Sequence, residues 1–557
     1  MENQNKKLRY GIMCNGHELD DWQGECLRHL AEWGKARPEV IIMRKEMRQK
    51  IGILTRIREK IGSGFLFRLW QRYFVKMQSN RKVRLEEFAG EATVHKMRII
   101  KKGKFSEYFS DADVEKIREY NLDFMLRFGF GIIRGKILQA ARYGVWSYHH
   151  GDERKYRGQP SVFREMYNNE PAIGGMLQRL TKRIDGGIIL KRWSVKNNMV
   201  NWGENIDALR YAGAGLIRQV CIDILNGNAD YFGAGESKTK AKMNSLPTNI
   251  EMCMFAGRIL INRIRTFLSS IFLTEEWNIG LLKKDIREVV KEKDFSRVHW
   301  FRRKSNGSFI ADPFGIYREE KLEVFFEEYD YKTGKGSIRR GVVGEDGRLK
   351  NVRKVLNTQS HCSYPYLIQD NGRIYAIPET GESGKVVLYE VDRQTGEFTN
   401  PKTIIEGVKV SDPTVFKHNG YWWLFGTIDE VRLYGWYSRE LSEEWREHKN
   451  NPLKIDISSA RPAGTPYVED GQMFRPAQDC SRTYGGRIVV NKVLSLTPEE
   501  FSEEEFDVIE LGRGNIYPLG PHTLASAGEV SLIDGKRWVF RPGVSLKKIM
   551  KKCATFI

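Results

Sequence analysis

Apolar residues in the first 240 positions alternate between two spacings. Short apolar runs of strand type are followed by stretches in which apolar residues recur every three or four positions, as on one face of a helix. We expect strands over 7–13, 40–43, 97–100 and 122–128, and helices over 22–32 and 111–120. Asp20 or Asp21 caps the first helix, and Ser110 or Asp111 the second. Strands that alternate with helices predict an α/β domain over residues 1–240.

From about Val298 the pattern changes to short apolar strands separated by Gly, Asn and Asp turns. Similar phrases recur at intervals of about 50 residues, the length of one four-stranded propeller blade. The phrases are FIADPFGIYREEKLEVFFEEY, SYPYLIQDNGRIYAIPET, VSDPTVFKHNGYWWLFGT, FRPAQDCSRTYGGRIVVNKV and HTLASAGEVSLIDGKRWVF. They predict an all-β five-bladed propeller over 298–557, preceded by a helical linker over 241–297.

Three further stretches combine apolar residues at helical spacing with arginine and lysine: 51–76, 254–273 and 544–557. One interpretation is a set of interfacial helices attracted to anionic lipid. The other is a set of ordinary helices that pack their apolar faces on neighbouring elements. The sequence leaves both open.

The charge balance narrows the choice of partners. The chain of 557 residues has 91 Lys and Arg against 71 Asp and Glu, a formal charge of +20. A compact basic arm or a known nucleic-acid reader motif is absent from the sequence, so we expect no nucleic-acid partner. Membrane headgroups and nucleotide-linked substrates remain as anionic partners.

The seven cysteines are scattered and form no CxxC pair. This pattern argues against disulfides and structural zinc, so we expect no metal and a reducing, cytoplasmic location. The sequence has neither an apolar run of about 18 residues nor a signal peptide. Peripheral contact with the inner face of an anionic membrane is compatible with this location.

The densest polar cluster of the first domain is GVWSYHHGDERKYRG, residues 144–158, which follows the expected strand 122–128. The carboxyl ends of parallel strands are where open α/β sheets bind ligands. Asp185 stands before a diglycine about 35 residues after His149 and His150, so a histidine and an aspartate could form a base and its orienting partner. The alternative is a hydrogen-bonded loop without chemistry.

These residues resemble the formyltransferase family, which moves a formyl group from 10-formyltetrahydrofolate to an amine. The family pattern has an Asn, one residue, a His, a loop that ends in Arg-Gly, and a later Asp. Here Ser147, Tyr148 and His149 occupy the first three positions, and Arg157-Gly158 and Asp185-Gly186-Gly187 keep register. The similarity is clear over about 122–190 and implies a Rossmann-like α/β domain.

The resemblance assigns roles to individual residues. It implies that His149 is the base or oxyanion stabiliser, that Asp185 orients it, and that Ser147 replaces the family's oxyanion-binding Asn. The charged loop that carries His150 and Asp152 departs from the family's apolar-Pro loop, and we assign these two side chains to substrate binding. The implied contacts to 10-formyltetrahydrofolate are Phe128, Gly129, Phe130, Gly131, Ile132, Arg157 and Gly158.

In the second domain, the openings of the repeated phrases place polar side chains toward the propeller axis. Asp312, Asp412, Arg475 and His522 are the expected substrate-binding residues. The arrangement resembles five-bladed sugar-cleaving propellers and, more closely, the propeller module of glucosamine inositolphosphorylceramide transferases. The resemblance implies a base and a second Asp at Asp312 and Asp412, whereas the acid has no clear match among Glu327, Glu379 and Asp479. Alternatively, Asp-Pro is a turn signal that opens a blade.

Together these patterns predict an enzyme of surface glycan biosynthesis. Its first domain would formylate a nucleotide- or lipid-linked amino sugar, and its propeller would bind or process the glycan. One alternative places glycosyltransferase or glycosidase activity in the propeller, with a degenerate formyltransferase domain. A second alternative is a glycan-binding adaptor at a membrane surface.

Overall fold

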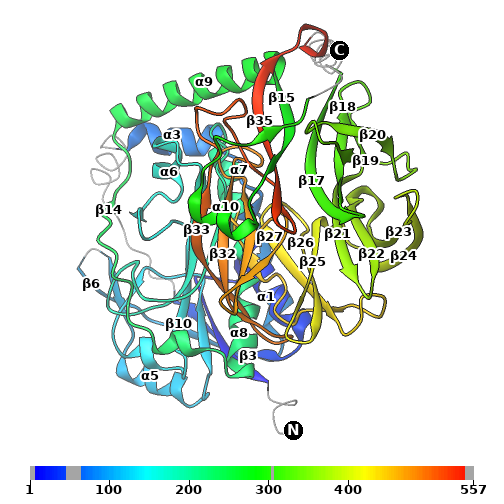
Figure 1. Ribbon diagram of the computed structural model, residues 1–557. Helices are drawn as coiled ribbons and strands as arrows, with labels where there is room; N and C mark the ends of the chain where they lie inside the picture. Colours follow the sequence, from blue (N-terminus) through cyan, green and yellow to red (C-terminus); the bar gives the residue numbers. More distant parts are fainter. Residues whose placement is uncertain (1–6, 46–63, 104, 303–306, 546–557) are drawn as a thin grey trace. The chain divides into compact units, whose positions relative to one another are not determined.

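The computed structural model describes residues 7–45, 64–103, 105–302 and 307–545 (Figure 1). The chain divides into two compact units, residues 1–263 and 264–557. The predicted helical stretches at 51–63 and 546–557 lie outside the described residues. Within the described ranges, no helix is long and apolar enough to cross a membrane.

The centre of the first unit is a seven-stranded mixed sheet in the order β13-β12-β10-β8-β1-β3-β5. The strands from β10 to β5 pair in parallel, and β12 and β13 pair antiparallel. Met13 and Met125 join an apolar cluster on one face, and the rings of Tyr10, Phe124 and Trp146 stack on the other. The strands are β1 (Leu8–Cys14), β3 (Ala36–Arg44), β5 (Thr93–Met97), β8 (Phe124–Arg127), β10 (Val145–His149), β12 (Ala172–Arg179) and β13 (Ile188–Lys196).

Two helices begin where the sequence predicts. The backbone N–H of Asp20 donates to Oε1 of Gln23 at 3.0 Å at the start of α1, and Ser110 Oγ accepts the N–H of Asp113 at the start of α5. The helices of this unit are α1 (Asp21–Trp33), α3 (Phe65–Phe74), α4 (Glu86–Ala89), α5 (Asp111–Arg118), α6 (Phe163–Tyr167), α7 (Trp202–Gly213) and α8 (Leu216–Asn226), and α9 (Asn249–Phe272) continues into the second unit.

The strand expected over 97–100 is displaced in the structure. β5 ends at Met97, and a separate short strand starts at Ile100. Because β5 is an edge strand with exposed Thr93, Val94 and Lys96, it lacks the apolar run used to locate it. Short strands complete the unit: β2 (Glu18–Asp20) with β4 (Lys82–Arg84), β6 (Ile100–Lys102) with β7 (Ser106–Tyr108) and β9 (Ile132–Ile133), and β11 (Arg157–Gly158) with β14 (Met243–Asn244).

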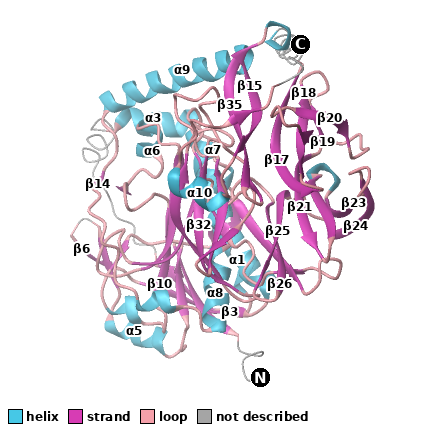
Figure 2. Cartoon of the chain, viewed as in Figure 1, coloured by secondary structure: helices cyan, strands magenta, loops and turns pink. Residues whose placement is uncertain are grey.

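The second unit consists mainly of five small antiparallel sheets (Figure 2). The first four are β17 (Ser308–Arg318) to β20 (Leu349–Lys354), β21 (Ser363–Asp370) to β24 (Phe398–Glu406), β25 (Ser411–His418) to β28 (Arg446–Glu447) and β30 (Tyr467–Glu469) to β33 (Phe501–Ile509). The strands between these ends are β18 (Lys321–Asp330), β19 (Lys335–Val343), β22 (Arg373–Glu379), β23 (Lys385–Val391), β26 (Tyr421–Thr427), β27 (Arg432–Ser438), β31 (Gln472–Asp479) and β32 (Arg487–Leu496), with β29 (Lys454–Ile455) beside β27.

The fifth sheet joins the two ends of this unit. Its order is β16-β15-β35-β34, with β15 (Leu273–Leu282), β16 (His299–Trp300), β34 (Leu524–Ala527) and β35 (Val530–Phe540). β15 pairs with β35 over its whole length, and α10 (Ile286–Glu292) follows β15. Neighbouring sheets share apolar clusters around the ring, so the arrangement is propeller-like.

The domain boundaries therefore differ from those predicted. Residues 241–297 were expected to form a helical linker, yet they contain β15, a central strand of the fifth sheet. A ring of sheets closes by pairing an early strand with the last ones, and the repeat pattern does not reveal that strand because it lies before the first phrase.

Candidate functional sites

In the first unit, the predicted pair of His149 and Asp185 is brought together at the end of β10. Nδ1 of His149 lies 3.5 Å from Oδ1 of Asp185, and Oδ2 of Asp185 accepts the backbone N–H of Gly158 at 3.1 Å. Nε2 of His149 is buried and has no hydrogen-bond partner among the described residues. A side chain at Gly151 would come within 3.0 Å of this atom, so the glycine leaves room beside it. One nitrogen of the imidazole is thus oriented, and the other is available.

Ser147 has a charged neighbour that the sequence did not indicate. Nη1 of Arg127, at the end of β8, donates to Oγ of Ser147 at 2.8 Å. Burial lowers the pKa of this guanidinium, while the carboxylates of Asp185 and Glu107 oppose that change. Its Nε is also buried without a partner in the described part of the chain. Where the formyltransferase family has the neutral amide of Asn, this chain therefore has the hydroxyl of Ser147, which accepts a hydrogen bond from the Arg127 guanidinium.

The loop expected to contact the cofactor uses its own donors elsewhere. The backbone N–H groups of Phe128 and Gly129 donate to the carbonyl of Met13. Those of Phe130, Gly131 and Ile132 donate to the side chain of Asn15, the side chain of Glu107 and the carbonyl of Phe105. The backbone N–H groups of residues 128–132 are therefore used within the protein.

Arg157 and Gly158 support the site from within the protein. The guanidinium of Arg157 donates to the backbone carbonyls of Ile184 and Ala241, which fixes the segment that carries Asp185. Gly158 has a φ of +88°, and a Cβ there would lie 2.2 Å from the carbonyl oxygen of Asn244. Both residues position Asp185, whereas the sequence had assigned them to the cofactor.

The two residues assigned to substrate binding in this unit point to other partners. The ring of His150 lies edge-on to Trp22 at 5.0 Å, and burial, Arg210 and His149 hold its pKa well below the ordinary value. It is thus a neutral member of an aromatic cluster. Asp152 accepts hydrogen bonds from the backbone and the guanidinium of Arg154 and so stabilises its own turn.

In the second unit, four sheets begin with the same short pattern, in which a small residue and a variable residue precede proline. The variable residues are Asp312, Tyr364, Asp412 and Arg461. At the first three, φ is +51°, +45° and +49°, and the strand pairing shifts register at the same place. Such a bulge with a left-handed residue is strained, and it redirects the side chain.

Backbone hydrogen bonds link each of these bulges to a carboxylate of the preceding sheet. The N–H of Asp312 donates to Oδ2 of Asp534 at 3.2 Å, and the N–H of Tyr364 donates to Oδ2 of Asp312 at 3.2 Å. The N–H of Asp412 donates to Oε2 of Glu379 at 2.9 Å. Acidic side chains therefore gather where the inner strands begin, and they also tie the sheets to one another.

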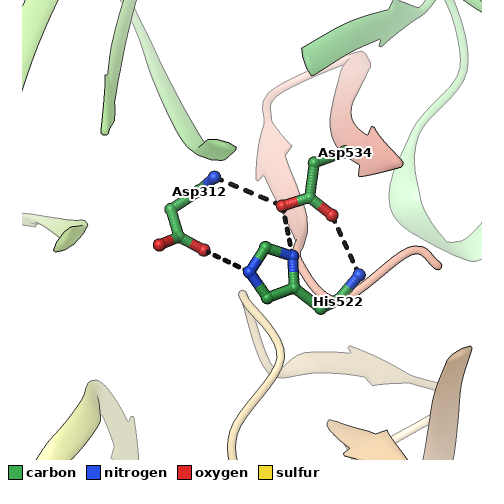
Figure 3. Close-up of side chains that lie close together, drawn as sticks. All are labelled: Asp312, His522 and Asp534. Atoms are coloured by element: carbon green, nitrogen blue, oxygen red, sulfur yellow. Dashed lines mark hydrogen bonds and ion pairs between the residues drawn. The ribbon is translucent and has the colours of Figure 1, made fainter. Parts of the chain in front are cut away.

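Asp312, His522 and Asp534 form the most enclosed part of this cluster (Figure 3). Nε2 of His522 lies 3.2 Å from Oδ1 of Asp312, and Nδ1 lies 2.6 Å from Oδ2 of Asp534. Burial alone would lower the pKa of His522, but the two carboxylates outweigh it and raise the pKa. The imidazole is therefore held as a cation between two anions.

The same three side chains lie close enough to hold a metal ion. However, Asp312 also accepts the hydroxyl of Thr523 and the N–H of Tyr364, and Asp534 accepts the backbone N–H groups of His522 and Thr523. With these donors on their oxygens, the carboxylates fit an imidazolium better than a metal ion.

Glu379, Asp412 and Arg461 form a second part of the cluster, in which Glu379 and Arg461 are partly exposed and Asp412 is buried. Nε of Arg461 contacts Oδ2 of Asp412 at 2.5 Å, and Nε2 of Gln478 donates to the same oxygen at 2.6 Å. The side chain of Glu379 is also a hydrogen-bond partner of Asp412. Nη2 of Arg461 donates to the hydroxyl of Tyr484 at 3.2 Å.

Two glutamates of the cluster are held neutral. Burial and the Asp412 carboxylate raise the pKa of Glu379 to about 8, although Arg461 opposes the shift. Burial and the surrounding carboxylates, Asp312 first among them, raise the pKa of Glu327 well above its usual value. The side chain of Glu379 keeps 13% of its surface exposed, so it is the proton donor within reach of a ligand.

Arg475 does not lie at the axis, contrary to the prediction. It is on β31, the second strand of its sheet, where regular pairing continues without a bulge. Its guanidinium pairs with Glu503 at 2.7 Å and donates to the carbonyls of Ser459 and Ala460. The sequence FRPA at residues 474–477 on β31 is nearly the same as ARPA at residues 460–463, which lies at the start of the inner segment of this sheet. Arg461, and not Arg475, therefore corresponds to Asp412. The small-residue, variable residue, Pro spacing could have identified it.

Comparison with known proteins connects the second unit to glycan-modifying enzymes. A model for "Glucosamine inositolphosphorylceramide transferase 1, N-terminal" matches residues 299–513. The transferase of that name from Oryza sativa subsp. japonica is 30% identical over 249 residues, 41% of this chain and 33% of the relative. The one from Arabidopsis thaliana is 30% identical over 257 residues, 41% and 32% of the two chains. The chain spans about a third of the length of these relatives.

A separate similarity concerns formyltransferases. The methionyl-tRNA formyltransferase of Phenylobacterium zucineum (strain HLK1) is 28% identical over 120 residues, which are 21% of this chain and 39% of that protein. This is a weaker and shorter match than those to the glucosamine inositolphosphorylceramide transferases.

Solved sugar-cleaving enzymes are similar at a low level. An exo-beta-1,3-galactanase from Phanerochaete chrysosporium matches with a TM-score of 0.31 and 13% identity, over 38% of this chain and 55% of that one. An alpha-L-arabinofuranosidase from Podospora anserina matches with a TM-score of 0.32 and 10% identity, over 42% and 93%. These scores are too low to support an inference.

The range matched by the transferase model contains the inner strands of four sheets. It includes Asp312, Glu379, Asp412 and Arg461, and it ends before His522. The similarity to a glycan-modifying transferase therefore covers Glu379, Asp412 and Arg461 together with Asp312, but not His522 or Asp534.

Proposed function

We propose that the second unit transfers or cleaves a glycosyl group at the cluster of Glu379, Asp412 and Arg461. The observation that carries this proposal is a partly exposed glutamic acid with a raised pKa beside an aspartate that an arginine and a glutamine hold in place. Breaking a glycosidic bond requires one carboxyl group that donates a proton and one carboxylate that accepts a proton, and their different environments set these two roles.

The proposed reaction uses these groups in turn. Glu379 gives its proton to the oxygen of the breaking glycosidic C–O bond, so the leaving group departs neutral. A hydroxyl of an acceptor, or water, forms the new C–O bond, and its proton passes to Oδ1 of Asp412. Arg461 holds Asp412 in place through Oδ2, and Asp312 and His522 brace the inner strands. Asp312 is thus a positioning residue, although the sequence suggested it as the base.

The substrate class follows from the relatives. Their name, "Glucosamine inositolphosphorylceramide transferase 1", refers to an amino sugar and to a lipid. We propose a nucleotide- or lipid-linked amino sugar, or a glycan that contains one, as the substrate of this chain. Buried carboxylates and an arginine suit the hydroxyl groups of a sugar, which both donate and accept hydrogen bonds.

Glu379→Gln tests this assignment. The purified chain is incubated with amino-sugar nucleotides and oligosaccharide acceptors, and products are followed by mass spectrometry. We expect Glu379→Gln to lower turnover by about 100-fold or more. Glu406→Gln is the matched control, because Glu406 is an exposed glutamate on β24. Turnover that survives both Glu379→Gln and Asp412→Asn would refute the proposed site.

A second candidate function, formyl transfer, is favoured by the geometry of the first unit. Asp185 orients His149, whose Nε2 is available, and Arg127 with Ser147 offers donors for a developing oxyanion. The mixed seven-stranded sheet is compatible with the Rossmann-like domain that this family implies. When bound, 10-formyltetrahydrofolate would supply the formyl group. His149 Nε2 would accept the proton that the attacking amine of an amino sugar loses.

The formyl-transfer hypothesis has its own test. An amino-sugar acceptor is incubated with the chain and 10-formyltetrahydrofolate, and addition of one formyl group is sought by mass spectrometry. His149→Ala should lower the rate by about 100-fold, since it removes the positioned base. Arg118→Lys, an exposed change on α5, is the control. If the wild-type chain formylates no amino sugar and folate does not alter its melting temperature, the first unit has no such activity.

A further inference from the structure

Two helices expose an unusual number of apolar side chains. On α3, Phe65, Leu69, Tyr73 and Phe74 are exposed, and Phe74 retains 76% of its surface. Only Phe67 of this helix is fully buried. A short surface helix that turns its large apolar side chains outward has more apolar surface than its own packing requires.

Six of the exposed apolar residues of α9 form a stripe. They recur three, four or seven positions apart, so they share one face of the 24-residue helix. Ile250 is 75% exposed at one end of the stripe. The stripe consists of Ile250, Met254, Ile261, Ile264, Leu268 and Phe272. At 1.5 Å per residue, the helix presents this face over about 36 Å.

Direct contacts join α3 to the first part of α9. The rings of Trp70 and Phe255 meet at 5.5 Å, and the backbone N–H of Leu66 donates to the side chain of Asn249 at 3.1 Å. Phe67 packs beneath them against Phe163. The buried sides of α3 and of the first part of α9 thus share one core, and we call the exposed residues of the two helices the α3–α9 face.

The charges of the α3–α9 face are almost all positive. The segment 64–80, which contains α3, has no Asp or Glu, and it carries Arg72 and Lys76 as exposed cations. On α9, exposed Arg265 lies beside the stripe, and Arg263 is exposed on an adjoining side of the helix. Its one carboxylate, Glu251, is paired with Arg164.

We propose that the α3–α9 face docks on an anionic lipid surface. Large apolar side chains that alternate with arginine on helices lying flat are the chemistry of interfacial binding, in which the apolar groups enter the headgroup region and the cations meet lipid phosphates. A second copy of the chain is a poorer occupant, because a symmetric contact would bring Arg72, Arg263 and Arg265 of both copies together. This proposal is independent of the chemistry assigned to either unit.

Vesicle sedimentation tests the docking. The full chain is mixed with phosphatidylcholine vesicles that either contain or lack phosphatidylserine. We expect it to pellet with the anionic vesicles and to be released by added salt. Equal binding to both kinds of vesicle, or to neither, would overturn the proposal.

Paired variants locate the contact. Phe74→Gln with Ile250→Gln should reduce vesicle binding at least tenfold with an unchanged melting temperature, since both side chains are already exposed. Val468→Gln with Ile516→Gln is the matched control, because these are exposed apolar residues elsewhere. Binding that survives the first pair refutes the α3–α9 face.

Two other occupants would be distinguished by the same variants. If a second copy covers the face, light scattering will show a dimer that Phe74→Gln with Ile250→Gln dissociates, and vesicles will not compete. If residues 46–63 of this chain cover it, the paired variant will lower the melting temperature without any vesicle binding to lose. Either result would replace the lipid proposal.

Discussion

The two candidate sites differ in how their polar side chains are held. In the first unit, Asp185 accepts a backbone N–H, and the imidazole of His149 keeps a buried nitrogen without a partner among the residues that the structure describes. In the second unit, both oxygens of Asp312 and of Asp534 are engaged by groups from other strands. The polar groups of the first site are therefore free to bind a ligand. Those of the second site serve partly to hold its sheets together.

This difference changes how mutations should be interpreted. A carboxylate that ties one sheet to the next contributes to folding, so loss of activity after its removal says little about chemistry. Glu379 also accepts the N–H of Asp412 from the next sheet, so variants at Glu379 and Asp412 need a stability measurement beside the turnover measurement. In the first unit, the site residues carry less of the fold, and their removal reports more directly on function.

The largest expected effect concerns closure of the second unit. A fragment of residues 264–557 should fold, whereas one of residues 298–557 should not, because it lacks β15 and leaves β35 without its ten-residue partner. Circular dichroism and limited proteolysis of both fragments would measure this. Cooperative melting of the shorter fragment would show that the second unit folds without a complete fifth sheet. The contrast between a second unit held together by its polar groups and a first unit that is not would then be weaker.

A smaller effect is expected from matched aspartate truncations. Asp312→Ala leaves two buried donors and an imidazolium without their acceptor, so it should destabilise the second unit by about 3–5 kcal/mol. Asp185→Ala leaves one part-buried N–H and should cost about 1 kcal/mol. Denaturant unfolding of each variant provides the values. Equal costs would break the distinction between the two sites.

Glu503 tests whether structural carboxylates extend beyond the axis. Burial would raise its pKa, but Arg475 and Lys454 outweigh burial and lower it to about 2. The unfolded chain then binds a proton near pH 4.5 that the folded chain does not, so this stability is present above that pH and is lost as the pH falls toward 2.

Glu503→Gln should therefore cost about 3 kcal/mol at neutral pH, and the difference should shrink in acid. Unfolding curves of the variant and the wild type across pH 2–7 check this expectation. A constant difference across that range would mean that the ion pair with Arg475 is not what stabilises this sheet.

The smallest expected effect is a shift of a pH profile. Because Glu379 must be protonated to donate, glycosyl turnover should fall as the pH rises through its raised pKa of about 8. An ordinary glutamate would lose its proton about four units lower. Glu379→Gln should remove this alkaline limb from the residual rate. A limb that persists in the variant would assign the proton donor to another group, with Glu327 the next to test.

Much of the local structure could be predicted from the sequence. The spacing of apolar residues locates the main strands and helices of the first unit, and the caps at Asp20 and Ser110 lie where they were expected. The recurring Asp-Pro phrases place Asp312 and Asp412 at the start of inner strands. The His149 and Asp185 pair was also anticipated. The elements, caps and phrases depend on side chains a few residues apart, which periodicity and motifs describe directly, whereas the His149 and Asp185 pair rested on the family resemblance.

The tertiary structure decided which polar groups meet. Asp534 and Glu379 join the axial cluster from sheets far apart in the sequence, and Arg461 takes the place that the phrase around Arg475 suggested. A bulge turns the side chain at Asp412 toward its partners, whereas regular pairing buries Arg475 within its own sheet. Likewise β15 pairs with a strand about 250 residues later. Sequence periodicity cannot predict the strand pairing that closes such a ring. The pairing energy comes from segments that meet only after the chain has folded.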